Sequence, residues 1–179
     1  MNLYTAATTP HTWGFSDLIN IMMISALPMG LGLIELASSA NGGAYRIFLD
    51  RAKKPTWAPP KASFHSGTCF ITLAPLGYAT YLVIKNSAGL ASMWSKMAFL
   101  FYACHAVFSM MYGCEVKKQN YEKVAYYKIG IAAAAIAFAL AYRPIDNFAF
   151  WLTVPHVFWS IFSAAYHYGI HQMNHIKKG

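Results

Sequence analysis

Polar and apolar residues of this chain fall into long alternating blocks. Apolar runs such as IGIAAAAIAFALAY (129–142) and MAFLFYACHAVFSMMYG (97–113) are separated by short segments that contain most of the charges. Blocks of about 20 apolar residues match the hydrocarbon thickness of a bilayer when they form helices. Isolated strands would leave backbone polar groups unpaired in lipid, so helices are favoured. The five predicted spans are 18–40, 64–84, 93–114, 124–142 and 148–170.

Composition supports the same assignment. Hydrophobic residues make up 57% of the chain and charged residues 11%, compared with roughly 45–50% and about 25% in soluble domains. A soluble fold could not cover this much apolar surface. The predicted fold class is therefore an all-α integral membrane protein, a bundle of five transmembrane helices. One domain is expected over 18–172, between an N-terminal tail (1–17) and a C-terminal tail (173–179).

The net charge of +8 is divided unequally between the two ends of the predicted bundle. Eleven Lys and Arg residues, Lys128 among them, fall in loops on one side, and three fall on the other. Because basic loops stay in the cytoplasm, the 41–63 loop and the C-terminus are predicted to be cytoplasmic. The charge is spread over short loops, which favours contact with anionic lipids and argues against nucleic-acid binding.

The 41–63 loop, the longest connection, divides into two parts. AYRIFLDRA (44–52) separates apolar from charged positions at helical spacing, which predicts a short interfacial helix. KPTWAPP (54–60) follows, and its prolines restrict the backbone to extended geometry. Trp57 in this stiff segment has two interpretations: an anchor at the bilayer surface, or a lid over the mouth of the bundle.

Histidines are the main candidates for chemistry inside the spans. His105 lies in the middle of the third span, and His167 lies on the fifth span, four residues before His171. Intramembrane ionisable groups usually face the bundle interior. Three roles remain open: structural hydrogen bonding, polar contact with an organic ligand, or axial ligation of a haem iron by His105 and His167. Glu35 is the only acidic residue of the first span and receives no role.

The fifth span carries aromatic residues mixed with small polar ones. Such a face suits a flat apolar ligand with a few polar edges, and it suits tight helix packing equally well. The chain shows no nucleophile–base arrangement and no phosphate-binding glycine loop. The sequence therefore predicts a protein that is not an enzyme.

Taken together, these features resemble the TspO/translocator-protein family, also called peripheral benzodiazepine receptor-like or tryptophan-rich sensory proteins. The family's K-P-x-W-x-P-P motif after its first helix is matched by KPTWAPP (54–60). LGYATYLV (76–83) is similar to the end of its second helix. PHVFWSIFSAAYHY (155–168) matches the spacing of its fifth helix, with His167 in the place of an Asn. The resemblance covers most of residues 20–172.

The chain also departs from the family's pattern at two places. HSGTCF (65–70) replaces the G-P-V-W at the start of the second helix. The third helix, which in relatives carries Q-x-x-x-N-W-x-W-P-P, here offers His105, Ser109 and Tyr112. A member that lacks several cavity tryptophans is expected to keep the fold and to bind a different ligand.

The resemblance implies a membrane translocator or sensor with a ligand cavity beneath the first loop. Ligands of relatives are porphyrins and haem, sterols such as cholesterol, and benzodiazepine-type drugs, with roles in tetrapyrrole or sterol transport. No cofactor is expected, although a tetrapyrrole is a possible ligand, and porphyrin degradation is a minor possibility. The predicted ligand-binding residues comprise a lid, a polar wall and a floor. They are Trp57, Pro59 and Pro60 (lid), His105 and Ser109 (wall), and Trp159, Phe162 and His167 (floor).

The same resemblance implies a location and partners. Relatives lie in the mitochondrial outer membrane of eukaryotes or in a bacterial cell membrane, and are often dimeric. Small residues in AGLAS (88–92) and GIAAAA (130–135) could form a homodimer contact or pack within one chain. Two other functions remain as alternatives: a bis-histidine haem redox protein, and a non-catalytic structural membrane subunit.

Overall fold

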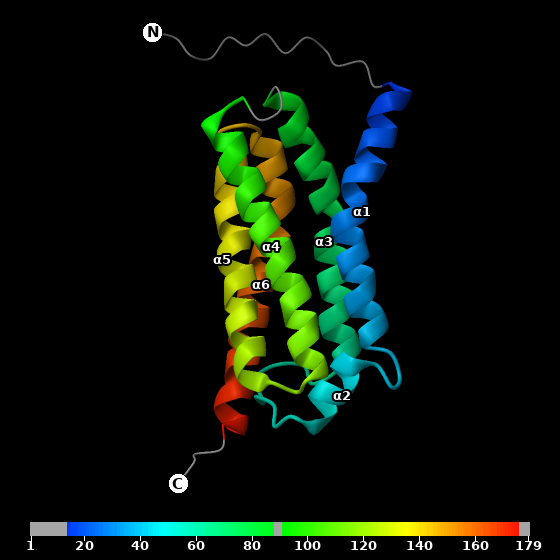
Figure 1. Cartoon of the computed structure of the whole chain (residues 1–179), viewed down its shortest axis with the longest axis vertical. Helices are drawn as coiled ribbons and strands as arrows, with labels where there is room; N and C mark the ends of the chain where they lie inside the picture. The colour runs from blue at the N-terminus through cyan, green and yellow to red at the C-terminus, as the bar shows by residue number, and fades with distance from the viewer. Residues whose placement is uncertain (1–13, 88–90, 176–179) are drawn as a thin grey trace.

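The computed structural model describes residues 14–87 and 91–175. The described residues form six α-helices and no strands. Their bounds are α1 (Phe15–Ser38), α2 (Ala44–Arg51), α3 (Ala62–Asn86), α4 (Met93–Lys117), α5 (Tyr121–Tyr142) and α6 (Asn147–Asn174). Five long helices run side by side, and the short α2 lies at one end of them (Figure 1).

The predicted five-span fold is confirmed. Five described helices, all except α2, are long and apolar enough to cross a membrane, so the chain is a multi-pass membrane protein. The observed helices differ from the predicted spans by one to four residues at most of their ends, and polar residues cap the starts of three of them. Side-chain oxygens of Ser92, Asn120 and Asp146 accept hydrogen bonds from backbone N–H groups at the starts of α4, α5 and α6, which would otherwise be unpaired.

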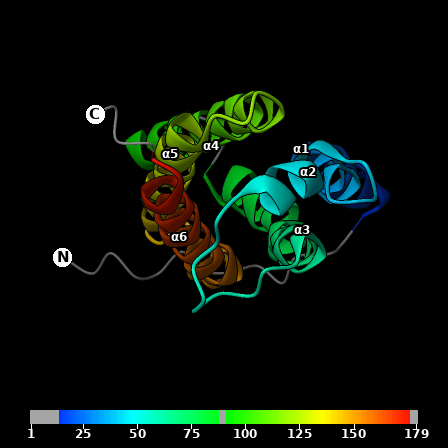
Figure 2. The same ribbon diagram turned by 90° about the horizontal axis from the view of Figure 1, so that it is seen from below.

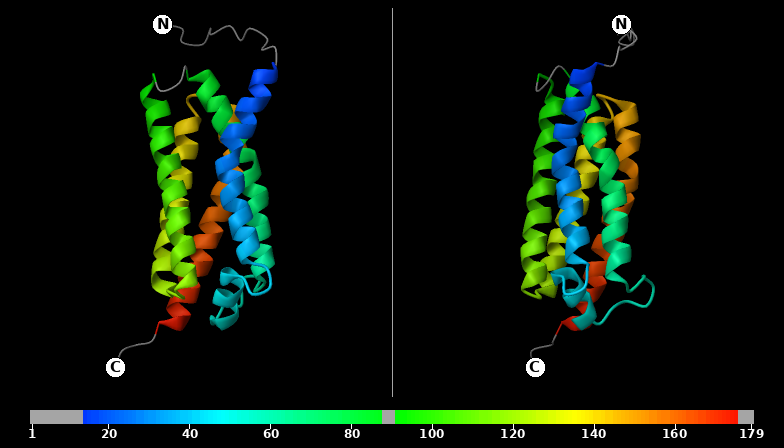
Figure 3. Two further views of the ribbon diagram at one scale, coloured as in Figure 1. Left: turned by 45° about the vertical axis from the view of Figure 1, so that its right-hand side comes forward. Right: turned by 90° about the vertical axis from the view of Figure 1, so that its right-hand side faces the viewer.

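Pairwise helix packing divides the bundle into two groups. Helix α1 packs mainly on α3, while α4 packs on α5 and α5 on α6; α3 and α6 join the two groups (Figures 1 and 3). Helix α1 is peripheral, since only Pro28 and Gly32 of its residues are buried. Its contact with α3 is nevertheless close: a Cβ added at Gly77 would lie 2.5 Å from the Cα of Ser25.

Helix α2 closes one end of the bundle. The predicted short helix is present, and its apolar face is turned onto the bundle: Tyr45, Phe48 and Leu49 are fully buried. Phe48 packs against Tyr121 and His167. Seen along the bundle, α2 lies across the end between α1 and α6 (Figure 2). Burial against protein thus takes the place of the expected contact with lipid headgroups, because the amphipathic face meets aromatic side chains there.

The predicted tails are only partly described. Residues 1–13 and 176–179 lie outside the described residues, as do 88–90 of the AGLAS segment. Phe15–Asp17 already belong to α1, and Met173 and Asn174 still belong to α6. In GIAAAA (130–135), Ile131, Ala132, Ala134 and Ala135 are buried inside the bundle. Most of that small-residue segment therefore packs within the chain, while Ala133 is exposed and a homodimer contact stays a prediction.

Candidate functional site

A cavity of about 250 Å³ lies between α1 on one side and α4 and α5 on the other. Helices α3 and α6 contribute to its walls, and α2 forms one end. Most of its lining is apolar and includes Leu31, Leu73, Ile131 and Trp159. From His105 to Lys117, both in its lining, the cavity follows α4 over about 18 Å at 1.5 Å per residue. It is the principal candidate for a functional site.

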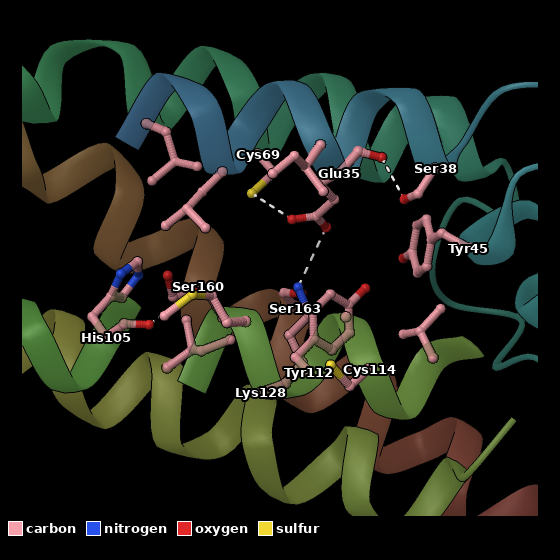
Figure 4. A pocket seen from close by; sticks show the side chains of 18 of the residues that line it. Glu35, Ser38, Tyr45, Cys69, His105, Tyr112, Cys114, Lys128, Ser160 and Ser163 are labelled. Atoms are coloured by element: carbon pink, nitrogen blue, oxygen red, sulfur yellow. Dashed lines mark hydrogen bonds and ion pairs between the residues drawn. The ribbon is translucent and has the colours of Figure 1, made fainter. Parts of the chain in front are cut away.

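An ion pair crosses the cavity. Lys128 Nζ of α5 lies 3.4 Å from Glu35 Oε1 of α1, and the second carboxylate oxygen accepts a hydrogen bond from the Cys69 thiol at 3.1 Å (Figure 4). The ammonium also lies 3.8 Å from the centroid of the Tyr112 ring, a cation–π contact. Lys128 is 4% exposed. Charges buried in this way are costly unless they are paired, and in membrane proteins they usually mark a ligand or ion path.

Two histidines form the polar group at the other end of the cavity. His105 Nε2 of α4 lies 3.0 Å from His156 Nε2 of α6. The Thr72 hydroxyl donates to the Cys69 carbonyl and lies 3.3 Å from His156 Nδ1. One arrangement of protons satisfies all these contacts: Thr72 accepts from His156 Nδ1–H, and His156 Nε2 accepts from His105 Nε2–H and from the Ser160 hydroxyl at 3.3 Å. Both rings can be neutral in this arrangement, which satisfies polar groups in the middle of the bundle.

The α2 end of the cavity is closed by Tyr45. The His167 Nδ1–H donates to the Ser163 carbonyl at 2.7 Å, so that Nε2 is free to accept the Tyr45 hydroxyl proton at 3.4 Å. Burial raises the pKa of Tyr45 well above its usual value, and the Glu35 carboxylate contributes in the same direction. Tyr45 is therefore a neutral phenol that fixes α2 to α6 and closes the cavity.

Some of the predicted site residues are brought together at this cavity. His105 and Ser109 of the predicted wall and Trp159 of the predicted floor line it. Phe162 lies behind Trp159, with stacked rings 5.3 Å apart, and His167 lies behind Tyr45. The structure pairs His105 with His156 and His167 with Tyr45, so the two histidines considered as a haem-ligating pair are engaged by different partners.

Lid residues Trp57, Pro59 and Pro60 lie elsewhere. Trp57 is 58% exposed and packs edge-on against Phe162 and Tyr166 of α6. Neither the tryptophan nor the two prolines of this predicted lid are among the cavity-lining residues. The end of the cavity is formed by Ala44 and Tyr45 of α2 instead. A direct contact between Trp57 and a ligand stays a prediction.

The proline-rich segment is nevertheless held in place, as its sequence predicts. The Asn174 amide accepts from the Lys53 N–H at 2.9 Å and donates to the Lys53 carbonyl at 2.8 Å. His65 Nε2 donates to the Pro59 carbonyl at 2.7 Å. A Cβ at Gly169 would lie 2.7 Å from the Pro55 ring, so glycine permits the segment to approach α6 closely.

Sequence reasoning missed several residues of the site: Glu35, Cys69, Tyr112, Lys128 and His156. The signal for two of them was present, since a lone carboxylate and a lone lysine beside apolar runs suggest an intramembrane pair. Lys128 was assigned to a loop, and this is corrected by its position in α5. Its removal leaves ten basic residues on the predicted cytoplasmic side against three, so the predicted orientation is unchanged.

The fold and the cavity together define a class: five-helix membrane proteins that enclose a mainly apolar pocket. The chain belongs to the TspO/MBR family, whose model matches residues 24–173. A search of curated proteins gave no match. Membership in this family supports a role as a membrane translocator or sensor, and the family is generally non-enzymatic.

Proposed function

We propose that this protein binds a hydrophobic ligand with polar edges inside the bundle and acts in its transport or sensing. Porphyrins, haem and sterols are the ligand classes that family membership favours; benzodiazepine-type drugs would occupy the same cavity. The observation that carries the proposal is the cavity itself, which combines apolar walls with an ion pair and a histidine pair. Ligand pockets typically combine these two kinds of lining.

To hold a porphyrin or a sterol, the cavity has to widen. Its volume of about 250 Å³ is below the roughly 300–1,000 Å³ of most small-molecule pockets. Helix α1 is the wall that can move at the least cost, because only Pro28 and Gly32 of this helix are buried. We infer that α1 shifts outward when a ligand enters, while α4, α5 and α6 keep their mutual packing.

Titration of the detergent-purified protein tests the proposal. Protoporphyrin IX and a fluorescent cholesterol analogue would be added separately, and tryptophan quenching or energy transfer would be followed. Trp159 lines the cavity and Trp57 does not, so Trp159→Phe should weaken saturable binding of the better ligand. Absence of saturable binding for both probes would contradict the proposal.

The Trp57→Phe variant separates two positions for the ligand. If only Trp159→Phe changes the affinity, the ligand occupies the cavity and the proline-rich segment is a structural support. If Trp57→Phe weakens binding as well, the segment acts as the lid that its sequence predicts. An effect of Trp57→Phe alone would place the ligand outside the cavity and would contradict the proposed site.

A further inference from the structure

The charges that line the cavity are unbalanced. Lys117 and Lys128 are in the lining, and Glu35 is the only carboxylate there. Lys117 is exposed at the end of α4, and Lys128 is buried. The buried pair of Glu35 and Lys128 is neutral as a whole, so the excess positive charge lies on Lys117 at the exposed end of the cavity, where it can attract anions toward the opening. A ligand that carries one negative charge would neutralise this lining.

Lys128 also has unused hydrogen-bonding capacity. Its ammonium group has three N–H donors, and the contact with Glu35 at 3.4 Å is its one hydrogen bond to the described residues. This is a long contact for a charge-assisted hydrogen bond, which is typically about 2.7–2.9 Å. The cation–π contact with Tyr112 supports the ammonium from one side. A ligand oxygen with a negative charge could therefore bind the Lys128 ammonium. It would compete only with Glu35, the present acceptor.

Tyr112 provides a second donor at the same place. It lines the cavity, is 5% exposed, and its hydroxyl makes no close hydrogen bond with the described residues, only a weaker interaction with the Tyr45 hydroxyl. A buried hydroxyl without a close partner is unfavourable, and such a group in a binding cavity indicates a missing acceptor. Figure 4 shows Tyr112 and Lys128 on the same side of the cavity, facing Glu35.

We propose that Lys128 and Tyr112 form a carboxylate-binding subsite, for which Glu35 competes in the ligand-free protein. The preferred ligands are then amphipathic acids, with a flat or elongated apolar body and at least one carboxylate, rather than neutral apolar molecules. This inference rests on the proposed function and narrows its ligand class. The acid would bind with its apolar body between α1, α4 and α6 and its carboxylate at Lys128.

Matched pairs of acid and neutral ligand test the subsite directly. Protoporphyrin IX would be compared with its dimethyl ester, and a sterol hemisuccinate with the parent sterol. The wild-type protein is expected to bind each acid at least about tenfold more tightly than its neutral partner, the effect of one hydrogen bond between charged groups. Equal affinities within both pairs would overturn the subsite while leaving the proposed function intact.

Three variants test whether the preference for acids over neutral ligands depends on Lys128, Tyr112 and Glu35. Glu35→Gln removes the competing carboxylate and is expected to tighten acid binding severalfold, with little effect on the esters. The double variant Glu35→Gln/Lys128→Gln keeps two polar groups of similar size without charge, and should reduce the acid-to-neutral ratio to about one. Tyr112→Phe leaves the ion pair in place and should reduce the ratio partially.

Controls separate the subsite from general electrostatics and from misfolding. Lys123→Gln removes a lysine that does not line the cavity and should leave the ratio unchanged. Each variant would be checked by gel filtration and thermal unfolding, and Tyr112→Phe provides the test if the double variant does not fold. A ratio that persists in Tyr112→Phe and in the double variant would overturn the inference. Absence of saturable binding for every probe would overturn the proposed function as well.

Discussion

Three pairs of buried polar side chains in this protein join different helices. Glu35 meets Lys128, His105 meets His156, and Tyr45 meets His167. Each contact joins two different elements across the interior. Because lipid offers no alternative hydrogen-bond partner, these pairs restrict how the helices can rotate about their axes.

Tyr45 gives this restriction a measurable pH dependence. Its raised pKa means that the folded protein keeps the phenol protonated at a pH where the unfolded chain, with a pKa of about 10, ionises. The contribution of Tyr45 to stability is therefore complete below about pH 10 and declines as the pH rises further. Tyr45→Phe should destabilise the protein by about 1 kcal/mol at pH 8, through the lost hydrogen bond.

Unfolding in detergent at pH 8 and pH 11 measures this difference. The wild type is expected to lose more stability than Tyr45→Phe on going to pH 11, so that the gap between the two proteins closes or reverses. A gap that stays constant between the two pH values would show that the Tyr45 phenol is not held neutral by burial.

Helix packing in this bundle depends on close approach at a few small residues. Gly77 lets α3 contact α1 closely, since a Cβ added at this position would overlap Ser25, at 2.5 Å from its Cα. Small residues have this role widely in membrane helices, where backbones approach through van der Waals contact. The α1–α3 pair is therefore expected to be sensitive at Gly77, although the rest of α1 is loosely packed.

Gly77→Val tests that contact. The added side chain must separate α1 from α3, and the expected cost is about 1–3 kcal/mol. Gly67 of the same helix is a control position, because a Cβ there meets no atom within 4 Å. Gly67→Ala should be neutral or stabilising by up to about 1 kcal/mol, through helix propensity.

Thermal unfolding followed by circular dichroism compares the two glycine variants. A lower midpoint for Gly77→Val than for Gly67→Ala is the expected result. If both variants melted together with the wild type, the close α1–α3 approach would not contribute to stability. Separation of α1 should also alter ligand affinity, because Leu31 and Glu35 of this helix line the cavity.

The arrangement of the five long helices places α2 and the end of α6 at the same end of the bundle (Figure 1). Basic loop residues predict that this end is cytoplasmic. The predicted orientation can be tested with single cysteines at opposite ends, in a protein whose three native cysteines are replaced. Asp50 and Pro144 suit the purpose because both are exposed.

Labelling of intact cells with a membrane-impermeant maleimide would give the orientation if the protein lies in the plasma membrane. The Pro144→Cys variant is expected to be labelled without permeabilisation, and the Asp50→Cys variant only after it. In mitochondria the pattern is reversed, since the cytoplasm is outside the organelle. Labelling of both positions without permeabilisation, or the opposite order, would contradict the orientation.

The number, approximate positions and helical nature of the spans followed from the sequence. Span length and apolar content are local properties, since about 20 apolar residues in lipid have to satisfy their own backbone. The short helix before the proline-rich segment was also predicted, because its apolar and charged positions separate at helical spacing. His105, Ser109 and Trp159, three of the predicted ligand-binding residues, line one cavity, and their contact with a ligand stays a prediction.

The partners inside the bundle depended on tertiary structure. Membrane helices are apolar on most of their surface, so periodicity does not show which face turns inward. Glu35 and Lys128 are 93 residues apart in the chain, and only the packing of α1 against the rest of the bundle brings them together. The same packing turned α2 inward and left Trp57 outside the cavity. Local chemistry specified the helices, and long-range contact specified the site.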